Sequence, residues 1–312
     1  MNLRDLKYII AVADLRHFGR AAERCFVSQP TLSGQIKKLE VELGVTIFER
    51  TRRTVDLTPV GEEIVAQARK VVEQVDALLQ LADRHQDPYA GPLRVGAIPT
   101  LSPYLMPLIL RPLKQRFPHM RLVLFEETTE RLLARLKSHE IDAVLLATSV
   151  DEPDLVVEPL FDEPFWLAHP VNDPLYTKDE ITREDIENLD LLLLADGHCL
   201  ANQVMDACGW EHRPVNSEMG ELRAASLETL LQLVGAGFGS TFVPALATRG
   251  SWMTDSGIVA RELDLPDTQR RISMVYRNSF PRKQALEGLA SVIRDNLPNT
   301  VAVVPAGEAA TV

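Results

Sequence analysis

The sequence predicts an α/β protein with a helix-rich head, a long linking helix and a larger two-lobed α/β body. Three observations predict it: apolar residues recur at helical spacing through the head, a heptad pattern follows, and short apolar runs then alternate with helical segments. The length of 312 residues suits about two domains. The predicted parts are residues 1–58 for the head, 59–89 for the linker helix, 90–298 for the body and 299–312 for a disordered tail.

Composition excludes several classes of protein. With 46% apolar and 25% charged residues, the chain has the profile of a folded soluble protein. No apolar run reaches the roughly 18 residues of a membrane span, and the charged N-terminus does not resemble a signal peptide, so we expect a cytoplasmic protein. Three cysteines exclude a disulfide framework, and no His/Cys group has zinc spacing. We expect no metal and no cofactor.

Charge is unevenly distributed. The whole chain carries 33 basic and 44 acidic residues, net −11, whereas residues 1–70 hold 12 basic and 9 acidic residues, net +3. A basic head on an acidic body suggests that only the head meets a polyanion.

Three helices are predicted in the head, with the order of a helix-turn-helix. Residues 3–15 carry apolar side chains at helical spacing, and a short helix over 20–25 carries alanines that allow a neighbouring helix to come close. Ser28 is a natural N-cap for a third helix, which Gly44 ends. The predicted buried stripe of this third helix is Leu32, Ile36, Leu39 and Leu43.

The other face of the third helix is polar at its start and basic further on, which suits base edges and then phosphates. An arginine-rich turn between two short strand-like pieces then predicts a wing. Together these features predict a winged helix-turn-helix domain that contacts DNA. The candidate DNA-binding residues are Ser28, Gln29, Pro30, Thr31, Ser33, Gln35, Lys37, Lys38, Arg50, Arg52 and Arg53.

Dense motifs in residues 1–65 carry a resemblance to a known family. They include Phe18-Gly19-Arg20-Ala21-Ala22, Val27-Ser28-Gln29-Pro30-Thr31-Leu32-Ser33 and Leu57-Thr58-Pro59. The head strongly resembles that of the LysR-type transcriptional regulators. The resemblance implies double-stranded DNA as a partner, a C-terminal sensor domain, contact with RNA polymerase, and dimers that pair into a homotetramer.

A heptad seam marks the linker helix. Its apolar positions are spaced alternately by four and three residues, as in a two-chain coil. Two half-sites one DNA turn apart require paired heads, so we expect a homodimer through this helix. The alternative is a helix that lies on its own domain. The seam residues are Ile64, Ala68, Val71, Val75, Leu78 and Ala82.

The body alternates strands and helices, which predicts a parallel sheet. Thr100, Ser102 and Thr129 come just after predicted strands and would face a ligand cleft at the strand ends, although for Ser102 helix capping is the expected sole role. The layout resembles the two-lobed, periplasmic-binding-protein-like effector domain of the LysR family. The predicted strands are 93–98, 122–125, 142–147, 191–194 and 272–276, and the predicted helices include 103–117 and 129–138.

Cys199 and Cys208 bracket another predicted helix. A thiol at a helix N-terminus meets a partial positive charge, which favours the reactive thiolate, and a second thiol can resolve the sulfenic acid that peroxide forms. Nine residues of helix span about 13–14 Å, whereas a disulfide needs Cα atoms within about 7 Å. A bond between them therefore requires this segment to refold. The alternative is two small buried hydrophobes, the role we expect of Cys25.

The cysteine segment resembles the hydrogen-peroxide-sensing branch of the LysR family, on the run Asp196-Gly197-His198-Cys199 with Gln203 and Cys208. The resemblance implies Cys199 as the peroxidatic thiol and Cys208 as the resolving thiol. It further implies peroxide-binding roles for Thr100, Thr129, His198 and Arg271.

One region departs from the pattern of that branch. The stretch between Cys208 and Ser226 is a few residues long, and Glu221 stands two residues before Arg223, where a histidine is expected. His212 is a possible substitute for that histidine.

The sequence thus predicts a non-enzymatic transcriptional activator that senses hydrogen peroxide and controls oxidative-stress genes. One alternative is a LysR-type regulator that binds a small metabolite in the cleft, with inert cysteines. A second is a thiol peroxidase, against which the DNA-reading head argues. A third is a periplasmic solute receptor, which the missing signal peptide disfavours.

Overall fold

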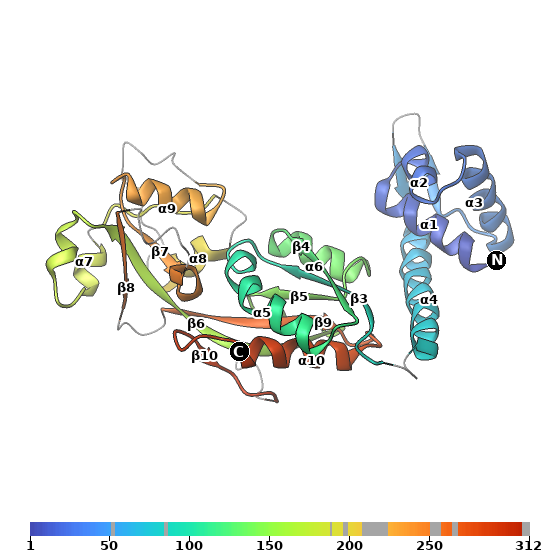
Figure 1. Ribbon diagram of the computed structural model, residues 1–312. Coiled ribbons are helices and arrows are strands. Elements are labelled where there is room, and N and C mark those ends of the chain that lie inside the picture. The colour runs from blue at the N-terminus through green and yellow to red at the C-terminus, as the bar shows by residue number, and fades with distance from the viewer. Residues whose placement is uncertain are drawn as a thin grey trace. The chain divides into compact units, whose positions relative to one another are not determined.

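The computed structural model describes residues 1–50, 54–83, 87–187, 189–195, 199–207, 224–249, 257–263 and 268–307 (Figure 1). The chain forms two compact units, Met1–Gln86 and Asp87–Val312, each with its own core. No helix in the described part of the chain is long and apolar enough to cross a membrane.

The first unit is the predicted three-helix head with a two-stranded hairpin. Asn2 caps the first helix and Ser28 caps the third, and Gly44 ends the third in the left-handed region at φ 70°. Leu43 was expected in the buried stripe, but it is 39% exposed, because the helix has already passed the edge of the core. The elements are α1 (Leu3–Leu15), α2 (Phe18–Arg24), α3 (Gln29–Leu43), β1 (Phe48–Arg50), β2 (Val55–Leu57) and α4 (Pro59–Asp83).

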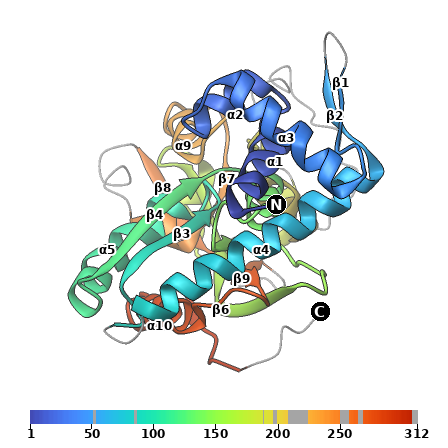
Figure 2. The same cartoon turned by 90° about the vertical axis from the view of Figure 1, so that its right-hand side faces the viewer.

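Helix α4 is long and begins next to the β1–β2 hairpin (Figure 2). A Cβ atom on Gly61 would lie 2.2 Å from the Ile47 carbonyl oxygen, so only glycine allows the first turn of α4 to pass this close to the chain. Val65 and Ala68 are buried against the head, and α1 packs along α4. Ala68 therefore belongs to the core of its own domain and not to a free seam. Val71 and Leu78 remain 39% and 68% exposed.

The first lobe of the body is built on a mixed sheet with strand order β10-β6-β9-β5-β3-β4. Strand β3 pairs in parallel with β4 and β5, whereas β9 runs antiparallel to β5 and β6. The expected parallel pairing is confirmed for β3, β4 and β5 and was wrong for β9, because the chain returns from the second lobe in the opposite direction. In Figure 1, α6 and α10 lie on opposite sides of these strands, and α5 packs against α10. The elements are β3 (Gly91–Ala97), α5 (Ser102–Arg116), β4 (Met120–Glu126), α6 (Thr129–Lys137), β5 (Ala143–Leu146), β9 (Gln269–Arg277), α10 (Lys283–Asp295) and β10 (Ala302–Val303).

Strand β6 (Leu155–Pro170) connects the two lobes. Its first part, to Pro164, pairs with β9 of the first lobe, and its second part, from Phe165, pairs with β7 and β8 of the second. The remaining elements of the second lobe are η1 (Pro174–Thr177), α7 (Arg183–Glu187), α8 (Cys199–Ala207), α9 (Leu227–Gly235), β7 (Thr241–Pro244), η2 (Ala245–Arg249) and β8 (Ile258–Glu262).

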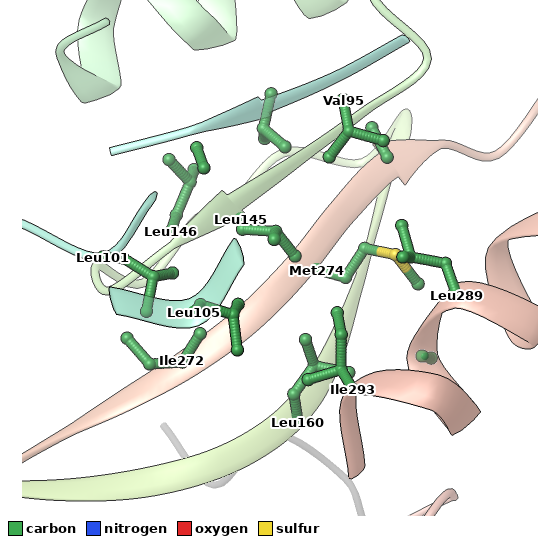
Figure 3. Close-up of a cluster of buried hydrophobic side chains, with 14 of the residues drawn as sticks. Val95, Leu101, Leu105, Leu145, Leu146, Leu160, Ile272, Met274, Leu289 and Ile293 are labelled. Carbon is green, nitrogen blue, oxygen red and sulfur yellow. The ribbon is translucent and has the colours of Figure 1, made fainter. Parts of the chain in front are cut away.

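Each lobe has its own hydrophobic core. In the first lobe, side chains from the sheet meet side chains from the helices in a close-packed layer (Figure 3). Full burial of one such Leu or Ile stabilises the fold by about 1.5–3 kcal/mol. The members drawn include Leu105 of α5, Leu145 and Leu146 of β5, Ile272 and Met274 of β9, and Leu289 and Ile293 of α10.

Two expectations about this unit were wrong. Residues 191–194 form no strand but only isolated bridges, from Leu191 to Ser240 and from Leu194 to Ala224, so the apolar run packs as irregular chain. The tail from 299 is ordered as far as it is described, to residue 307. Its strand β10 pairs with β6, and Val304 is buried, which provides the apolar contact that fixes it.

Candidate functional site

Helix α3 presents the predicted DNA-reading face to solvent. Leu32, Ile36 and Leu39 are buried in the core of the head and fix the orientation of the helix. The opposite face of α3 is turned toward solvent, and a face of short polar groups followed by lysines can enter a major groove. Its exposed members are Ser28, Gln29, Pro30, Thr31, Gln35, Lys37 and Lys38, and Ser33 is half-buried.

The N-terminus of α3 is held by its own hydroxyls. Ser28 Oγ accepts a hydrogen bond from the Thr31 backbone N–H at 3.3 Å, and the two hydroxyl oxygens lie 2.8 Å apart. The capped, exposed helix start suits a phosphate or a base edge, because helix N-termini favour negative groups.

The predicted wing is present as the β1–β2 hairpin. The backbone of Arg50 pairs with that of Val55 at the tip side of the hairpin. Arg52 and Arg53 lie outside the described residues, and only the backbone of Arg50 is described. Contact of these arginines with DNA stays a prediction.

Cys199 is the first residue of α8, where the two lobes meet. It is half-buried and packs against the core of the first lobe. Leu200 and Val204 of the same helix are buried in the core of the second lobe. Helix α8 therefore holds the thiol at a helix N-terminus between two cores. His198 and Cys208, which flank the helix in sequence, lie outside the described residues.

Three threonines follow the three parallel strands. Thr100, Thr129 and Thr148 come after β3, β4 and β5, whose carboxyl ends share one edge of the sheet. The Oγ1 atoms of Thr129 and Thr148 are buried and have no hydrogen-bond partner among the described residues. An unpartnered buried hydroxyl costs free energy, so a water or a small polar ligand is the natural partner.

Helix capping does not account for the residues at this edge. The cap position of α5 is Leu101, and Ser102 is the buried first residue of the helix, so the expected capping role of Ser102 was wrong. The cap position of α6 is Thr128, which leaves the Thr129 hydroxyl without a capping bond.

The structure brings Arg270, and not Arg271, to Thr100. Arg270 donates to Thr100 Oγ1 and to the Thr100 carbonyl oxygen, both at 2.9 Å, and it pairs with Glu163 at 2.9 Å. Both side chains of this ion pair are almost fully buried. Arg271 instead forms two 2.7 Å bonds with Asp162. The two arginines are neighbours in a strand, so they point to opposite faces of the sheet.

A tyrosine joins the lobes beside this arginine. Tyr104 of α5 donates to Glu228 Oε1 of α9 at 2.8 Å and packs against both cores. Burial, followed by the Glu228 carboxylate, raises the pKa of Tyr104, while Arg270 acts in the opposite direction. The phenol is thus held in its neutral, hydrogen-bond-donating form.

Cys25 differs from Cys199 in its surroundings. It lies at the end of α2, half-buried against the core of the head, where burial raises the pKa of its thiol. This confirms the expected packing role. Among the described residues no group of His, Cys, Asp and Glu has the geometry of a metal site.

Five residues at the junction of the lobes were not predicted from the sequence: Tyr104, Glu163, Arg270, Thr148 and Gln203. Gln203 Nε2 donates to the Ala147 carbonyl oxygen at 2.5 Å. Two signals were available, because Thr148 follows a strand just as Thr100 does, and Gln203 lies one helical turn from Cys199. No local sequence pattern pointed to the buried ion pair of Arg270 and Glu163.

Known families match both units. Residues 3–62 match the bacterial regulatory helix-turn-helix protein family of the LysR type, and residues 86–298 match the LysR substrate binding domain. Among curated proteins, the DNA-binding transcriptional dual regulator OxyR of Escherichia coli strain K12 is 44% identical over 294 residues, which are 94% of this chain and 95% of that protein.

Solved structures agree with this assignment. A full-length OxyR from Pseudomonas aeruginosa, with a cysteine replaced by aspartate, superimposes with a TM-score of 0.80 at 40% identity and covers 100% of this chain and 99% of its own. A cysteine-to-serine variant of Corynebacterium glutamicum OxyR with bound hydrogen peroxide gives 0.64 at 34% identity, covering 95% and 92%. The chain therefore belongs to the LysR family of bacterial helix-turn-helix regulators, in which it resembles the OxyR proteins in sequence and in fold.

Proposed function

We propose that this protein is a transcriptional regulator that binds DNA through α3 and the wing and senses hydrogen peroxide through Cys199 and Cys208. The observation that carries the proposal is the position of Cys199, at the N-terminus of a helix whose two faces pack on different lobes. A chemical change at this sulfur acts directly on the packing between the lobes. The regulated genes are those of the oxidative-stress response, which the protein activates in the cytoplasm.

The redox step uses both thiols. The Cys199 thiolate attacks one peroxide oxygen, the O–O bond breaks, and Cys199 becomes a sulfenic acid while water leaves after one proton is taken up. The sulfur of Cys208 then attacks the Cys199 sulfur, the S–O bond breaks, and a second water leaves as the S–S bond forms. Two thiols are oxidised by two electrons in total, and one peroxide is reduced to two waters.

Helix α8 cannot survive this second step. Its eight steps from Cys199 to Ala207 span about 12 Å, and the one further residue to Cys208 brings the chain back by at most about 3.8 Å. The remaining separation exceeds the roughly 7 Å that a disulfide allows between Cα atoms. Oxidation therefore requires α8 to unwind, which is a two-state change of the kind that switches an interface.

Side chains at the strand ends hold the peroxide in this proposal. The Thr129 hydroxyl has a free hydrogen-bonding capacity, and the Thr100 hydroxyl is fixed by Arg270. Arg270 takes over the place in the peroxide site that the resemblance gave to Arg271, because Arg270 contacts Thr100 whereas Arg271 is engaged by Asp162. His198, next to the thiol in sequence, is the remaining proposed peroxide ligand.

The linker helix supplies the dimer. Val71 and Leu78 of α4 expose apolar side chains on the predicted heptad seam. We infer a homodimer through this seam, which pairs two heads for two half-sites, and a homotetramer through the bodies. RNA polymerase is the further partner that an activator needs.

The test is the peroxide response of the DNA complex. A DNA fragment selected from random sequence by the reduced full-length protein is footprinted before and after a small excess of peroxide. We expect Cys199→Ser to bind this DNA with unchanged affinity and to lose the peroxide-dependent change of the footprint, whereas Cys25→Ser behaves like the wild type. A footprint that still responds to peroxide in Cys199→Ser would contradict the proposal.

A further inference from the structure

Gln203 joins helix α8 to the first lobe. Leu200 and Val204 anchor α8 in the core of the second lobe, whereas the Gln203 Nε2 atom donates to the carbonyl oxygen of Ala147, one residue beyond β5 of the first lobe. The other amide atom, Oε1, is buried and has no partner among the described residues. The amide of Gln203 thus holds α8 to the first lobe through its N–H group alone.

Cys199 and Gln203 share one face of α8. They are four residues apart, which places them one above the other on the helix surface. Both contact the first lobe, Cys199 through its core and Gln203 through the Ala147 carbonyl. The hydrogen bond therefore acts on the face of the helix that carries the reacting sulfur.

We propose that Gln203 is a positioning residue that stabilises the reduced form by fixing α8, and with it Cys199, against the first lobe. This inference rests on the proposed oxidation of Cys199. Because α8 must unwind before the Cys199–Cys208 bond can form, the Gln203–Ala147 hydrogen bond is present in the dithiol form and lost in the disulfide form. The hydrogen bond therefore stabilises the dithiol form and does not stabilise the disulfide form.

Removal of this bond shifts the thiol–disulfide equilibrium toward the disulfide. A typical net hydrogen-bond contribution corresponds to a roughly three- to tenfold change in an equilibrium constant. For a two-electron couple, tenfold is about 30 mV, with the variant having the more negative potential.

The experiment measures this equilibrium in the full-length protein. Wild type, Gln203→Leu and Gln203→Glu are equilibrated in glutathione buffers of known ratio, free thiols are blocked, and the fraction of Cys199–Cys208 disulfide is measured by peptide mass spectrometry. Gln232→Leu removes an exposed amide from α9 and serves as the matched control. We expect Gln203→Leu to shift the equilibrium three- to tenfold toward the disulfide and Gln232→Leu to leave it unchanged.

Gln203→Glu separates a positioning role from a general structural one. A carboxylate cannot donate to the Ala147 carbonyl oxygen, but a protonated carboxyl can. The shift of Gln203→Glu relative to wild type should therefore be large at pH 8 and shrink as the pH falls, while that of Gln203→Leu stays constant. An unchanged equilibrium in Gln203→Leu, or a pH-independent shift in Gln203→Glu, overturns the proposal.

Hydrogen exchange of the reduced protein tests the same bond without any redox step. Amides of residues 200–207 should exchange at least threefold faster in Gln203→Leu than in wild type or Gln232→Leu. Equal exchange overturns the positioning role. A wild type that forms no Cys199–Cys208 disulfide while Gln203→Leu exchanges faster contradicts the proposed redox function alone.

Discussion

At the scale of single residues, two adjacent arginines of β9 differ in their burial and in their partners. Arg270 and Glu163 face each other across the β6–β9 pairing in a buried ion pair, with the Thr100 hydroxyl as a third member. Arg271 and Asp162 pair one step along on the other face, where the arginine side chain is 34% exposed. Burial decides which pair the fold depends on, because a buried charge without its partner is far more costly than an exposed one.

Replacement of each arginine by leucine separates the two cases. Arg270→Leu leaves the buried Glu163 carboxylate without its counter-charge, with the Leu246 backbone N–H as its remaining donor among the described residues, and should lower the free energy of unfolding by about 3–5 kcal/mol. Arg271→Leu breaks a partly exposed pair and should cost no more than about 1 kcal/mol. Urea unfolding followed by tryptophan fluorescence reports the body alone, because the tryptophans are Trp166, Trp210 and Trp252. Equal losses in the two variants would contradict this assignment.

Thr129→Val tests whether a buried hydroxyl is kept for function. Its Oγ1 has no partner among the described residues, so the isosteric valine should leave stability unchanged or raise it by about 1 kcal/mol. Oxidation of Cys199 by peroxide should at the same time become at least tenfold slower, measured by quenched thiol labelling. The control is Thr241→Val, which removes a 2.8 Å bond from Thr241 Oγ1 to the Leu192 carbonyl oxygen and should cost about 1–3 kcal/mol without slowing oxidation. Unchanged oxidation in Thr129→Val would exclude this hydroxyl from the site.

At the scale of elements, α4 has one apolar face that packs on the head and a second that is exposed to solvent. Val65 and Ala68 pack on their own head, while Val71 and Leu78 point an apolar stripe at solvent. The sequence pattern could not separate these faces, because the heptad seam and the face that packs on the head both contain Ala68. Only the packing of α1 along α4 shows which residues are already used.

A charge on the exposed apolar face of α4 should weaken the dimer and leave the fold of the head unchanged. Leu78→Asp places a carboxylate in the proposed coil, and we expect at least a tenfold weaker dimer by sedimentation equilibrium, with unchanged helix content by circular dichroism. Ala66→Asp, exposed on the same helix on the side away from the seam, is the control and should leave dimerisation unchanged. A dimer that resists Leu78→Asp would remove this seam from the interface.

Local sequence patterns predicted some of the helices well but failed for one strand and for the tail. Helices α1, α3 and α6 follow their predicted limits closely, because an apolar stripe marks each of them, and a capping side chain also marks the start of α1 and of α3. Leu191–Leu194 has the composition of a strand, but its neighbours offer only isolated bridges, and strand formation depends on those neighbours. The ordered tail was missed for a related reason, since Val301 and Val304 are fixed by contacts with residues distant in sequence.

At the scale of the whole molecule, the sequence predicted the two units and the helix that begins at Cys199, but not the hydrogen bonds that surround this helix. A basic helix-turn-helix unit and an acidic α/β unit follow from periodicity, charge and motif, and Cys199 lies at a helix start as expected. The bonds that join the lobes at this point, from Tyr104 and Gln203, and the bond from Arg270 to Thr100 within the first lobe link residues 56 to 170 positions apart. Such pairs depend on how distant parts of the chain come together, so no local sequence pattern marks them.

The central claim is that peroxide joins Cys199 to Cys208 and unwinds α8. It is tested most directly by treatment of the reduced full-length protein with a small excess of hydrogen peroxide, blocking of free thiols and peptide mass spectrometry of all three cysteines. We expect a fast, thiol-reversible Cys199–Cys208 link with Cys25 left free. Cysteines that stay reduced at modest peroxide would contradict it and leave a LysR-family regulator that responds to a different ligand.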